Sequence, residues 1–563
     1  MLRWIVTSLT LLVSPFAVAE PADAVFLGDH IITMEKSLRG KEPTALAIRG
    51  GKIVWRGDRH DAGDQIGSNT RVVELGERAL LPGFIDAHGH FLMTAAATGM
   101  ANVSAPPVGS VTDIPALQRT LSAWIAQRGI PDGQWVVGFG YDDSLLVERR
   151  HPTRVDLDAV STRHPILLAH VSGHLMAVNS AALTAIGISA DTPDPAGGII
   201  RRQAGTMEPD GVMEETATMP FRARFAPAMN AEVIRAGLLS YAAFGITTIQ
   251  DGASDPGSVG LLTKMADDGV LTQDIVAYPV LVPQALGNEP FFSPGDYQRN
   301  FRVGGIKLIL DGSPQGKTAY LSSAYVHPPH GQDAGYKGYP TYPQAQVDDL
   351  VSYAISRHIP LIAHTNGDAA ADMLLDAVDK ALAQRVPRPD HRTVMIHAQT
   401  VREDQLDRMQ TLGVIPSFFS AHTFYWGDWH RDSVLGPARA ARISPTRTTL
   451  ERGMHFTVHN DAPIVPADMV RLLWATTNRL TRTDQVLGAD QRIDTWEALN
   501  AMTGDAAWQY FEETGKGTLT PGKQADLVVL NTNPLALPRE RLLELRVEAT
   551  WAHGREIYRR QTP

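Results

Sequence analysis

The sequence predicts an α/β protein: a (β/α)8 TIM-like barrel with a large insertion after its first strand and a small composite β-sandwich domain drawn from both termini. Three observations predict this fold. Eight short apolar runs occur, six of which end in a polar or charged residue; helix-like stretches such as 345–357 and 370–384 separate several of them, and both chain ends carry short apolar runs broken by turn residues. Active sites of such barrels lie at the carboxyl ends of the strands, so the polar run ends are the candidate functional residues.

The composition limits the classes of function. The chain has 563 residues, of which 44% are hydrophobic and 20% charged, as is typical of a globular protein with several structural units. Lys and Arg number 51 against 61 Asp and Glu, a net charge of -10, so the chain lacks the basic field that holds nucleic acid. Cysteine is absent, which excludes thiolate nucleophiles and leaves His, Asp, Glu or modified Lys to bind any metal.

Residues 1–19 are predicted to be a signal peptide. Arg3 precedes a mostly apolar stretch, and the small residues Ala17 and Ala19 precede Glu20, as a signal peptidase requires. A membrane anchor is disfavoured because polar residues interrupt a run that is shorter than the roughly 20 residues needed to span a bilayer. We expect cleavage after Ala19 and an exported protein, periplasmic or secreted, without a stable membrane anchor.

The short β-like segments of the two chain ends predict one composite β domain, formed by residues 20–81 and 515–563. Residues 82–514 form the predicted barrel between them. Its eight strands are expected within residues 84–90, 246–251, 274–280, 306–311, 360–364, 394–397, 414–419 and 456–461.

The stretch between His90 and Gly245 is far longer than one βα crossover. It predicts an inserted subdomain over about residues 100–235 of the barrel. Tyr141, Asp142 and Asp143 form a polar motif within this insertion, to which the sequence assigns no role.

Four histidines and one aspartate occupy the ends of four predicted strands. His88 and His90 are two residues apart on the first run, so their imidazoles leave the same face of a strand and could meet one cation. Such a pair is by itself commonly structural. His364, His397 and Asp461 end three further runs, and a packing role does not explain all five. Imidazole together with carboxylate suits zinc or another first-row divalent ion.

Lys307 lies within the apolar run that ends at Asp311, and strand alternation places both residues on the same face. Burial disfavours the charged amine and depresses its pKa. Two interpretations stay open: an ion pair with Asp311, or a carbamate formed with CO2 whose two oxygens bridge a pair of metal ions.

These residues and their neighbours resemble the metal-dependent amidohydrolase superfamily, and within it the branch of N-substituted formamide deformylase-like proteins, amidohydrolase family 3. The matching stretches extend along the chain after the signal peptide: Leu81 to His90, Gly173-His174 with Asn179-Ser180, Gly211 to Glu215, Lys307 with Asp311 to Ser313, His364 with Gly367-Asp368, His397 to Gln399, Asn460 to Pro463, and Gly517 to Leu530. The resemblance implies a barrel with the terminal β domain and with one or two divalent ions, zinc foremost, held by His88, His90, Lys307 (often carbamylated at this position), His364, His397 and Asp461.

Two departures from the family pattern bear on the pocket. Relatives usually show Gly-Ser-Asp on the last strand, where this chain has His459-Asn460-Asp461. After Asp311-Gly-Ser this chain reads Pro-Gln-Gly-Lys, where relatives commonly have Leu-Gly and then Arg. The expected ligands survive both changes.

Four further residues are candidates for substrate binding. Glu215 and His174 lie in family-like elements of the insertion, although Glu215 could equally be a solvated carboxylate beside Glu214. His422 and Trp426 follow the seventh predicted strand, where barrel loops line the site.

The expected reaction is hydrolysis of a carbon–nitrogen bond by metal-activated water in a non-peptide amide, such as an N-acyl, N-formyl or cyclic amide of small to moderate size. Asp461 would accept the proton of the water and pass it to the leaving nitrogen. A lactonase, esterase or phosphotriesterase-like reaction on the same site is an alternative, and so is a non-catalytic exported binding or regulatory protein. The sequence leaves the number of metal ions and the oligomeric state, including a homo-oligomer, open.

Overall fold

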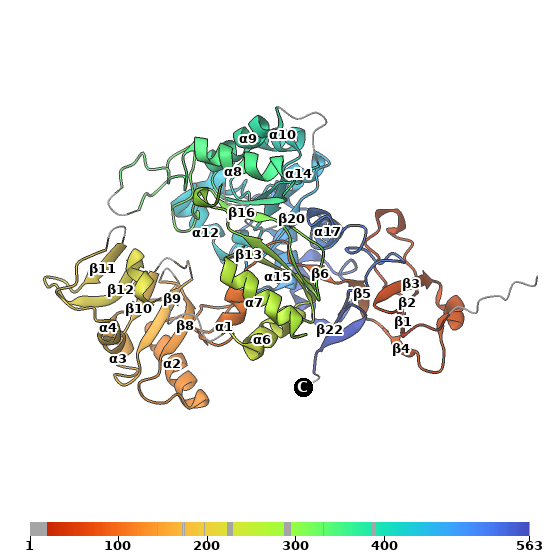
Figure 1. Cartoon of the computed structure of the whole chain (residues 1–563), viewed down its shortest axis with the longest axis horizontal. Helices are drawn as coiled ribbons and strands as arrows, with labels where there is room; N and C mark the ends of the chain where they lie inside the picture. Colours follow the sequence, from red (N-terminus) through yellow and green to blue (C-terminus); the bar gives the residue numbers. More distant parts are fainter. Residues whose placement is uncertain are drawn as a thin grey trace, which may run out of the picture.

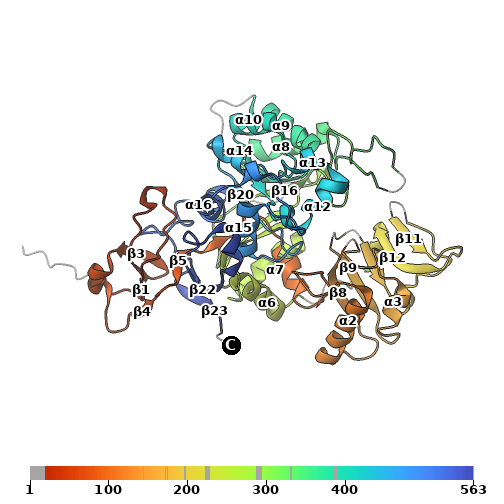
Figure 2. The same cartoon turned by 180° about the vertical axis from the view of Figure 1, so that it is seen from behind.

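The structure is a computed structural model that describes residues 20–143, 145–171, 173, 175–195, 198–221, 229–286, 294–329, 332–383 and 390–561, apart from the side chain of Glu215. The predicted signal peptide and His174 therefore lie outside the described residues. Three parts are visible in Figure 1: a central α/β part, the insertion on one side of it, and the strands of the N-terminal segment on the other. The view from behind shows the same arrangement (Figure 2).

The central part is built on parallel strands, and each of the eight predicted runs contains one. The strands are β6 (Phe84–Ile85), β13 (Ile246–Ser254), β14 (Asp274–Pro279), β16 (Ile306–Ile309), β17 (Leu361–Thr365), β18 (Val394–His397), β19 (Ile415–Phe418) and β20 (Thr457–Val458). They form two sheets, with the orders β15-β14-β13-β6 and β16-β17-β18-β19-β20. Their Val-rich and Ile-rich runs are buried, as expected of parallel strands covered on both faces.

Backbone hydrogen bonds link these two sheets at two places. Leu281 N, just after the inner strand β14, donates to the carbonyl of Lys307 on the edge strand β16 over 2.8 Å. On the other side, beyond the edge strands β6 and β20, Asp461 N donates to His88 O (3.2 Å) and His90 N donates to Ala462 O (2.8 Å). The segments that follow the first and last strands are thus held side by side.

One strand of the central part was not predicted. β15 (Phe301–Val303) pairs in parallel with β14, and Gly304 and Gly305 separate it from β16. Three residues are too short a run to stand out by pattern.

One apolar cluster joins the two parallel sheets. It unites side chains from β6, β14, β17, β18 and β19 and is closed by residues of α17 (Gly504–Gln509) and by Tyr510. Ile362 in this cluster and His364 are two residues apart on β17, so the same strand face that packs the cluster also carries a candidate functional residue.

Helices cover the outside of the strands. They are α1 (Phe91–Ala97), α6 (Ala231–Ala242), α7 (Pro256–Asp267), α8 (Gln344–Ser356), α9 (Asp368–Leu382), α10 (Glu403–Leu412), α11 (His422–Tyr425), α12 (Gly427–Trp429), α13 (Pro437–Ala440), α14 (Thr446–Glu451), α15 (Met469–Asn478) and α16 (Thr495–Ala501). The helices expected over 345–357 and 370–384 correspond to α8 and α9, each with its apolar residues buried against the sheet.

The insertion holds a six-stranded sheet of order β11-β12-β10-β9-β8-β7. Its elements are β7 (Ala101–Asn102), α2 (Ile114–Arg128), β8 (Val136–Tyr141), α3 (Arg154–Asp158), β9 (Ile166–His170), β10 (Leu175–Val178), α4 (Ser180–Ile186), β11 (Gly198–Arg202) and β12 (Pro209–Glu215). The Asp113 carboxylate accepts the Ala116 N–H at the start of α2, and Gly129, with φ of 56°, ends that helix.

Strands of the two chain ends form two further sheets. One has the order β3-β2-β1-β4, made of β1 (Ala24–Leu27), β2 (Ala45–Arg49), β3 (Lys52–Gly57) and β4 (Arg71–Glu74); the other has the order β23-β22-β21-β5, made of β5 (Ala79–Pro82), β21 (Leu527–Leu530), β22 (Val547–Ala552) and β23 (Arg555–Arg559). A single apolar cluster contains residues of both ends, among them Phe26 and Trp551, whose rings meet edge to face at 5.2 Å.

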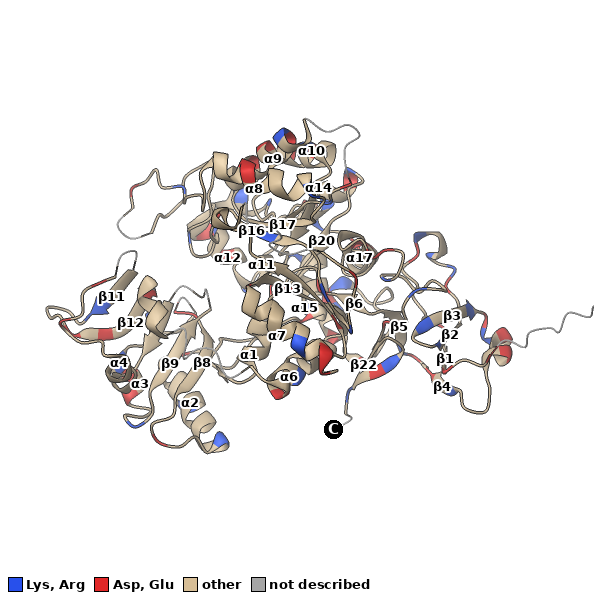
Figure 3. Cartoon of the chain, viewed as in Figure 1, with Lys and Arg blue, Asp and Glu red and all other residues tan. Residues whose placement is uncertain are grey.

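Charged side chains of both signs are interspersed over the fold (Figure 3). Among the residues described, no helix combines the length and the apolar character needed to cross a membrane.

Candidate metal centre

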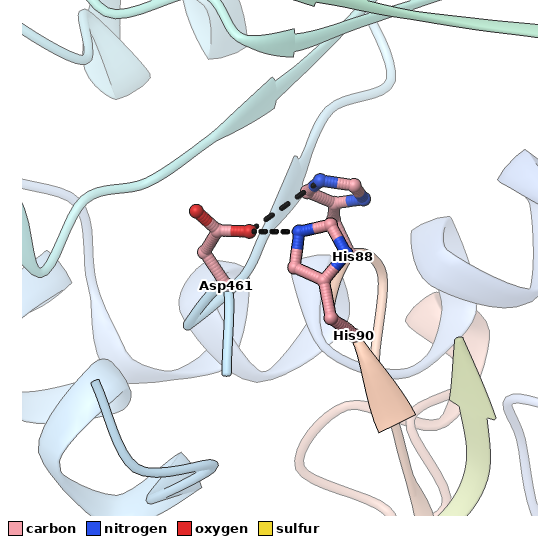
Figure 4. A group of neighbouring side chains, drawn as sticks. All are labelled: His88, His90 and Asp461. Carbon is pink, nitrogen blue, oxygen red and sulfur yellow. Dashed lines mark ion pairs between the residues drawn. The ribbon is translucent and has the colours of Figure 1, made fainter. Parts of the chain in front are cut away.

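The six residues expected to hold metal lie in one cluster at the carboxyl ends of the parallel strands. Asp461 Oδ1 is 3.1 Å from His90 Nε2 and 3.5 Å from His88 Nε2, as Figure 4 shows. Lys307 Nζ lies 3.1 Å from the same His88 nitrogen. The centroid of the His397 ring is 5.6 Å from the centroid of the His88 ring and 4.5 Å from that of the His364 ring. The contacts therefore form a continuous chain from His90 to His364.

The first His pair is not on a strand, contrary to expectation. β6 ends at Ile85, and His88 and His90 lie in the segment that leads into α1. His90 instead forms an isolated antiparallel bridge with Asp251, which lies within β13. The two imidazoles still converge on Asp461, because this segment is hydrogen-bonded to the segment after β20.

Two of the six residues have left-handed backbones, with φ of 71° at His397 and 56° at Asp461. Residues with a Cβ seldom adopt this region, and such strain, of order 1–3 kcal/mol, gathers at functional sites. The backbone turns at the strand end here and aims each side chain into the cluster.

Hydrogen bonds fix which nitrogen of His88 faces the cluster. Gln250 donates its Nε2 hydrogens to the Ala87 carbonyl (3.1 Å) and the Tyr510 hydroxyl (2.7 Å), so its Oε1 is left to accept from His88 Nδ1. Burial also holds the pKa of His88 well below its ordinary value, so the ring is neutral. Its Nε2 therefore presents a lone pair to Lys307 and Asp461.

His397 is oriented by a second buried pair. His397 Nδ1 lies 3.1 Å from His459 Nε2, and His459 Nδ1 lies 2.9 Å from the Ser417 hydroxyl. Burial lowers the pKa of His459 to about 3, so this imidazole is neutral and carries one proton. If that proton is donated to Ser417, His459 accepts from His397 and leaves His397 Nε2 unprotonated.

Sequence reasoning missed His459 and Gln250 as members of the site. A signal for His459 was present, because it precedes Asp461 by the same two-residue spacing that relates His88 to His90. Gln250 is a polar residue inside a predicted apolar run, one position before the polar residue that ends it.

Lys307 does not pair with Asp311. The Asp311 carboxylate accepts the backbone N–H groups of Asn366 (2.9 Å), Gly367 (2.7 Å) and Tyr320 (3.0 Å), and so anchors two loops. β16 ends at Ile309, which interrupts the alternation that placed both residues on one face. Burial lowers the pKa of the Lys307 amine to about 7, so a large neutral fraction is available at physiological pH.

Two buried atoms of the cluster that could bind a metal ion make no hydrogen bond of regular geometry: Asp461 Oδ1 and His364 Nδ1. Burial opposes ionisation of Asp461, but His90 and the nearby basic groups hold its pKa below the ordinary value, so this oxygen is anionic. Buried polar atoms are normally satisfied, and carboxylate oxygens and imidazole nitrogens that converge in this way are the ligand atoms a divalent ion uses. The residues present fit a divalent metal ion.

The substrate-binding candidates are distributed differently. Glu215 ends β12 on the insertion, and His174 lies outside the described residues. His422 is buried and stacked on His430, with 2.9 Å between His422 Nδ1 and His430 Nε2. Trp426 lines a cavity of about 330 Å³.

This cavity lies between the insertion and the central part. The central part contributes Thr94, Trp426 and Pro463, and the insertion contributes Phe139 and Val171. Thr94 donates to the carbonyl of His90 (3.0 Å), and Pro463 is two residues beyond Asp461. The cavity wall is thus continuous in the chain with the candidate metal centre and is mostly apolar.

The sequence of this chain is similar to those of known proteins. The sequence profile of the amidohydrolase family matches residues 71–558. N-substituted formamide deformylase of Arthrobacter pascens is 27% identical over 562 residues, covering 96% of this chain and 98% of that protein. The protein LONG AFTER FAR-RED 3 of Arabidopsis thaliana is 26% identical, covering 95% and 92% respectively.

A solved structure has the same overall fold. The crystal structure described as an uncharacterized metal-dependent hydrolase from Pyrococcus horikoshii OT3 superposes with a TM-score of 0.72 at 22% identity, over 92% of this chain and 99% of that one. The likeness shows a shared α/β TIM-like fold.

Proposed function

This chain belongs to the amidohydrolase family, and from that premise we propose that it is a metal-dependent hydrolase that cleaves a non-peptide carbon–nitrogen bond. The observation that carries the proposal is the convergence of imidazole nitrogens and the Asp461 carboxylate at the ends of the parallel strands, where Asp461 Oδ1 lies 3.1 Å from His90 Nε2 and 3.5 Å from His88 Nε2. The whole-length similarity to a formamide deformylase supports the choice of bond.

We assign the metal to His88, His90, Lys307, His364, His397 and Asp461. A divalent ion held there lowers the pKa of a water molecule towards 7 and polarises a carbonyl group. Zinc suits the imidazole and carboxylate donors. We further propose that the Lys307 amine adds to CO2 and loses a proton, so that two carbamate oxygens replace one nitrogen and can bridge two ions.

Asp461 is the proposed proton shuttle. Its pKa is held low, so at neutral pH it is an anion able to take the proton of the attacking water. It then passes the proton to the leaving nitrogen, because an amide expels an amine only once that nitrogen is protonated. His90, 3.1 Å away, orients the carboxylate for both steps.

Gln250 and His459 are positioning residues in this proposal. Each bonds to Nδ1 of one imidazole and thereby leaves Nε2 of that imidazole as the donor. Partners of this kind fix ring orientation and raise ligand basicity.

The fold supports two finer structural proposals. We infer that the parallel strands close into a (β/α)8 barrel, because backbone hydrogen bonds link the two sheets on both sides and one apolar cluster unites five of the strands. We call the cluster of the six proposed metal ligands at its strand ends the barrel mouth. We also propose residues 20–81 with 515–563 as a composite β-sandwich domain and residues 100–235 as an inserted subdomain, since each has its own sheets and apolar clusters.

The substrate proposed is a small amide whose apolar substituent occupies the cavity beside Trp426 and Pro463. We also propose that residues 1–19 direct export and are removed after Ala19. N-terminal sequencing of exported protein tests this, and a soluble protein that retains Met1 would contradict it.

The function is tested by metal analysis of purified full-length protein followed by turnover assays. The substrates are formamides, N-acyl amino acids, cyclic amides, esters and lactones. We expect bound divalent metal, activity that a chelator removes and metal restores, and the largest kcat/KM on an amide. Preference for an ester or lactone would reassign the bond cleaved, and absence of hydrolysis by metal-loaded protein would favour a binding or regulatory role.

A further inference from the structure

The polar motif of the insertion is part of a second cluster of metal-ligating side chains. Asp142 and Asp143 directly follow β8, and His170 ends β9, the parallel neighbour of β8. Tyr141 and His170 are register partners, so the motif and this histidine emerge at the same edge of the sheet. The carboxyl edge of parallel strands is where ligands bind in α/β sheets.

Donor atoms of this cluster converge as closely as those at the barrel mouth. One atom from each of Asp142, Asp143 and His170 lies within 4.8 Å of the other two. His170 Nε2 is 3.0 Å from Asp143 Oδ1, and His151 Nε2 is 3.7 Å from Asp143 Oδ2. The side chains of both histidines and of Asp142 are largely buried.

The charges in this cluster favour a cation. The cluster gathers two carboxylates and two imidazoles. In the described part of the chain, the ion-pair partners of Asp143 are these two imidazoles, while Arg201 pairs with Glu214.

Tyr141 gives His151 a fixed orientation. The Tyr141 hydroxyl lies 3.3 Å from His151 Nδ1, on the side of the ring opposite the nitrogen that faces Asp143. Burial raises the pKa of Tyr141, so its phenol stays neutral and can accept the Nδ1 proton. A hydrogen-bonded partner on the far nitrogen is the usual environment of a metal-binding histidine.

We propose that Asp142, Asp143 and His170, together with His151, form a second divalent-cation site in the insertion, separate from the barrel-mouth site. Two carboxylates and two imidazoles suit zinc or another first-row ion. Asp142 also lines the cavity between the insertion and the central part, so an ion here would sit at the cavity wall. The inference does not rest on the hydrolase function.

The experiment uses the full chain with the barrel site removed. In His88→Ala/His90→Ala protein, Co²⁺ binding is measured by equilibrium dialysis with elemental analysis, by visible absorption and by the Co²⁺-dependent shift in Tm. We expect about one ion per chain to remain in this variant. The ion should be lost when Asp143→Asn/His170→Gln is added.

A matched control is the pair His455–Asp505, whose Nδ1 and Oδ1 atoms are 2.7 Å apart. Among the described residues, this pair belongs to no group of three or more side chains that could hold a metal ion. His455→Gln/Asp505→Asn should leave the retained ion in place. If the double insertion variant fails to fold by circular dichroism, Asp142→Asn replaces it and should weaken Co²⁺ binding at least about tenfold.

Two results would overturn the inference: no ion bound by the barrel-site variant, or binding unaffected by the insertion substitutions. The first would leave Asp143 and its imidazoles as a hydrogen-bonded cluster only. Failure of the proposed hydrolase function would look different, as protein that binds Co²⁺ at both sites yet hydrolyses nothing.

Discussion

The barrel mouth and the insertion each gather histidines and aspartates at the carboxyl edge of parallel strands, but the two clusters differ in how their polar atoms are satisfied. At the barrel mouth, Gln250 and His459 bond to the Nδ1 atoms of His88 and His397, the nitrogens that face away from the cluster. In the insertion, Asp143 is bonded directly to His170. Two imidazoles of the first cluster thus have partners outside the proposed ligand set, whereas His170 of the second cluster is bonded to another proposed ligand.

The difference indicates how far each site is organised before an ion binds. The barrel donors come from five separate strands or the segments after them, and strained backbones at His397 and Asp461 aim two of them. The proposed ligands in the insertion come chiefly from the ends of two neighbouring strands and from a loop. The hydrogen bond between His170 and Asp143 must break before both side chains can bind an ion. We therefore expect tighter binding at the barrel mouth.

The largest effect is expected for Asp461→Asn, which keeps the shape and one oxygen but removes the base. Turnover should fall about 10²-fold to 10⁴-fold, the usual contribution of general acid–base catalysis, while most of the metal is retained. Metal content and kcat are measured on the same preparation across pH. Turnover within a few-fold of the parent, with an unchanged acidic limb, would show that Asp461 is not the shuttle.

Lys307→Ala should lower the bound metal at the barrel mouth towards roughly one ion per chain, because a bridging ligand of a two-ion site is lost. Short carboxylic acids should partly restore metal and activity by supplying the missing oxygens. The Asp143→Asn/His170→Gln variant serves as the comparison, since it should leave this stoichiometry at the barrel mouth unchanged. The proposed carbamate bridge would be refuted if the parent protein holds one ion at the barrel mouth and bicarbonate changes neither its metal content nor its turnover.

His459→Ala should weaken metal binding at the barrel mouth by about 10-fold to 100-fold, the range for loss of a partner of a metal-binding histidine. Co²⁺ absorption should also change, because the His397 ring is no longer held. His459→Asn, which can still accept from His397, should recover part of the affinity. Equal Co²⁺ spectra and affinities for parent and His459→Ala would leave His459 as a packing residue.

The sequence predicted the strands more fully than the site. Each of the eight predicted apolar runs locates a parallel strand, because burial on both faces demands such runs. The sequence pattern could not show that β6 and β20 are only two residues long, because the length of a strand depends on its backbone hydrogen bonds and not on its composition.

The partners of the site residues were harder to predict. Asp311 was placed beside Lys307 by alternation, but it caps backbone N–H groups of two loops, a contact that depends on the path of chain far away in sequence. His459 and Gln250 act through single hydrogen bonds across strands, which periodicity does not encode.

The smallest effect concerns the surface pair His455–Asp505, which gives the baseline for a His–Asp contact without convergent ligands. The hydrogen bond from His455 to Asp505 raises the pKa of His455 above its ordinary value near 6.5. A raised folded-state pKa means that the pair stabilises the protein fully below pH about 6.5 and that this contribution is lost as pH rises through the folded pKa. Since His455 is 49% exposed, the effect should be only about 0.2–1 kcal/mol. Urea midpoints of the parent and His455→Gln, measured from pH 5 to 9, should converge as pH rises, and a gap that widens with pH would show that the pair does not act through the charged imidazole.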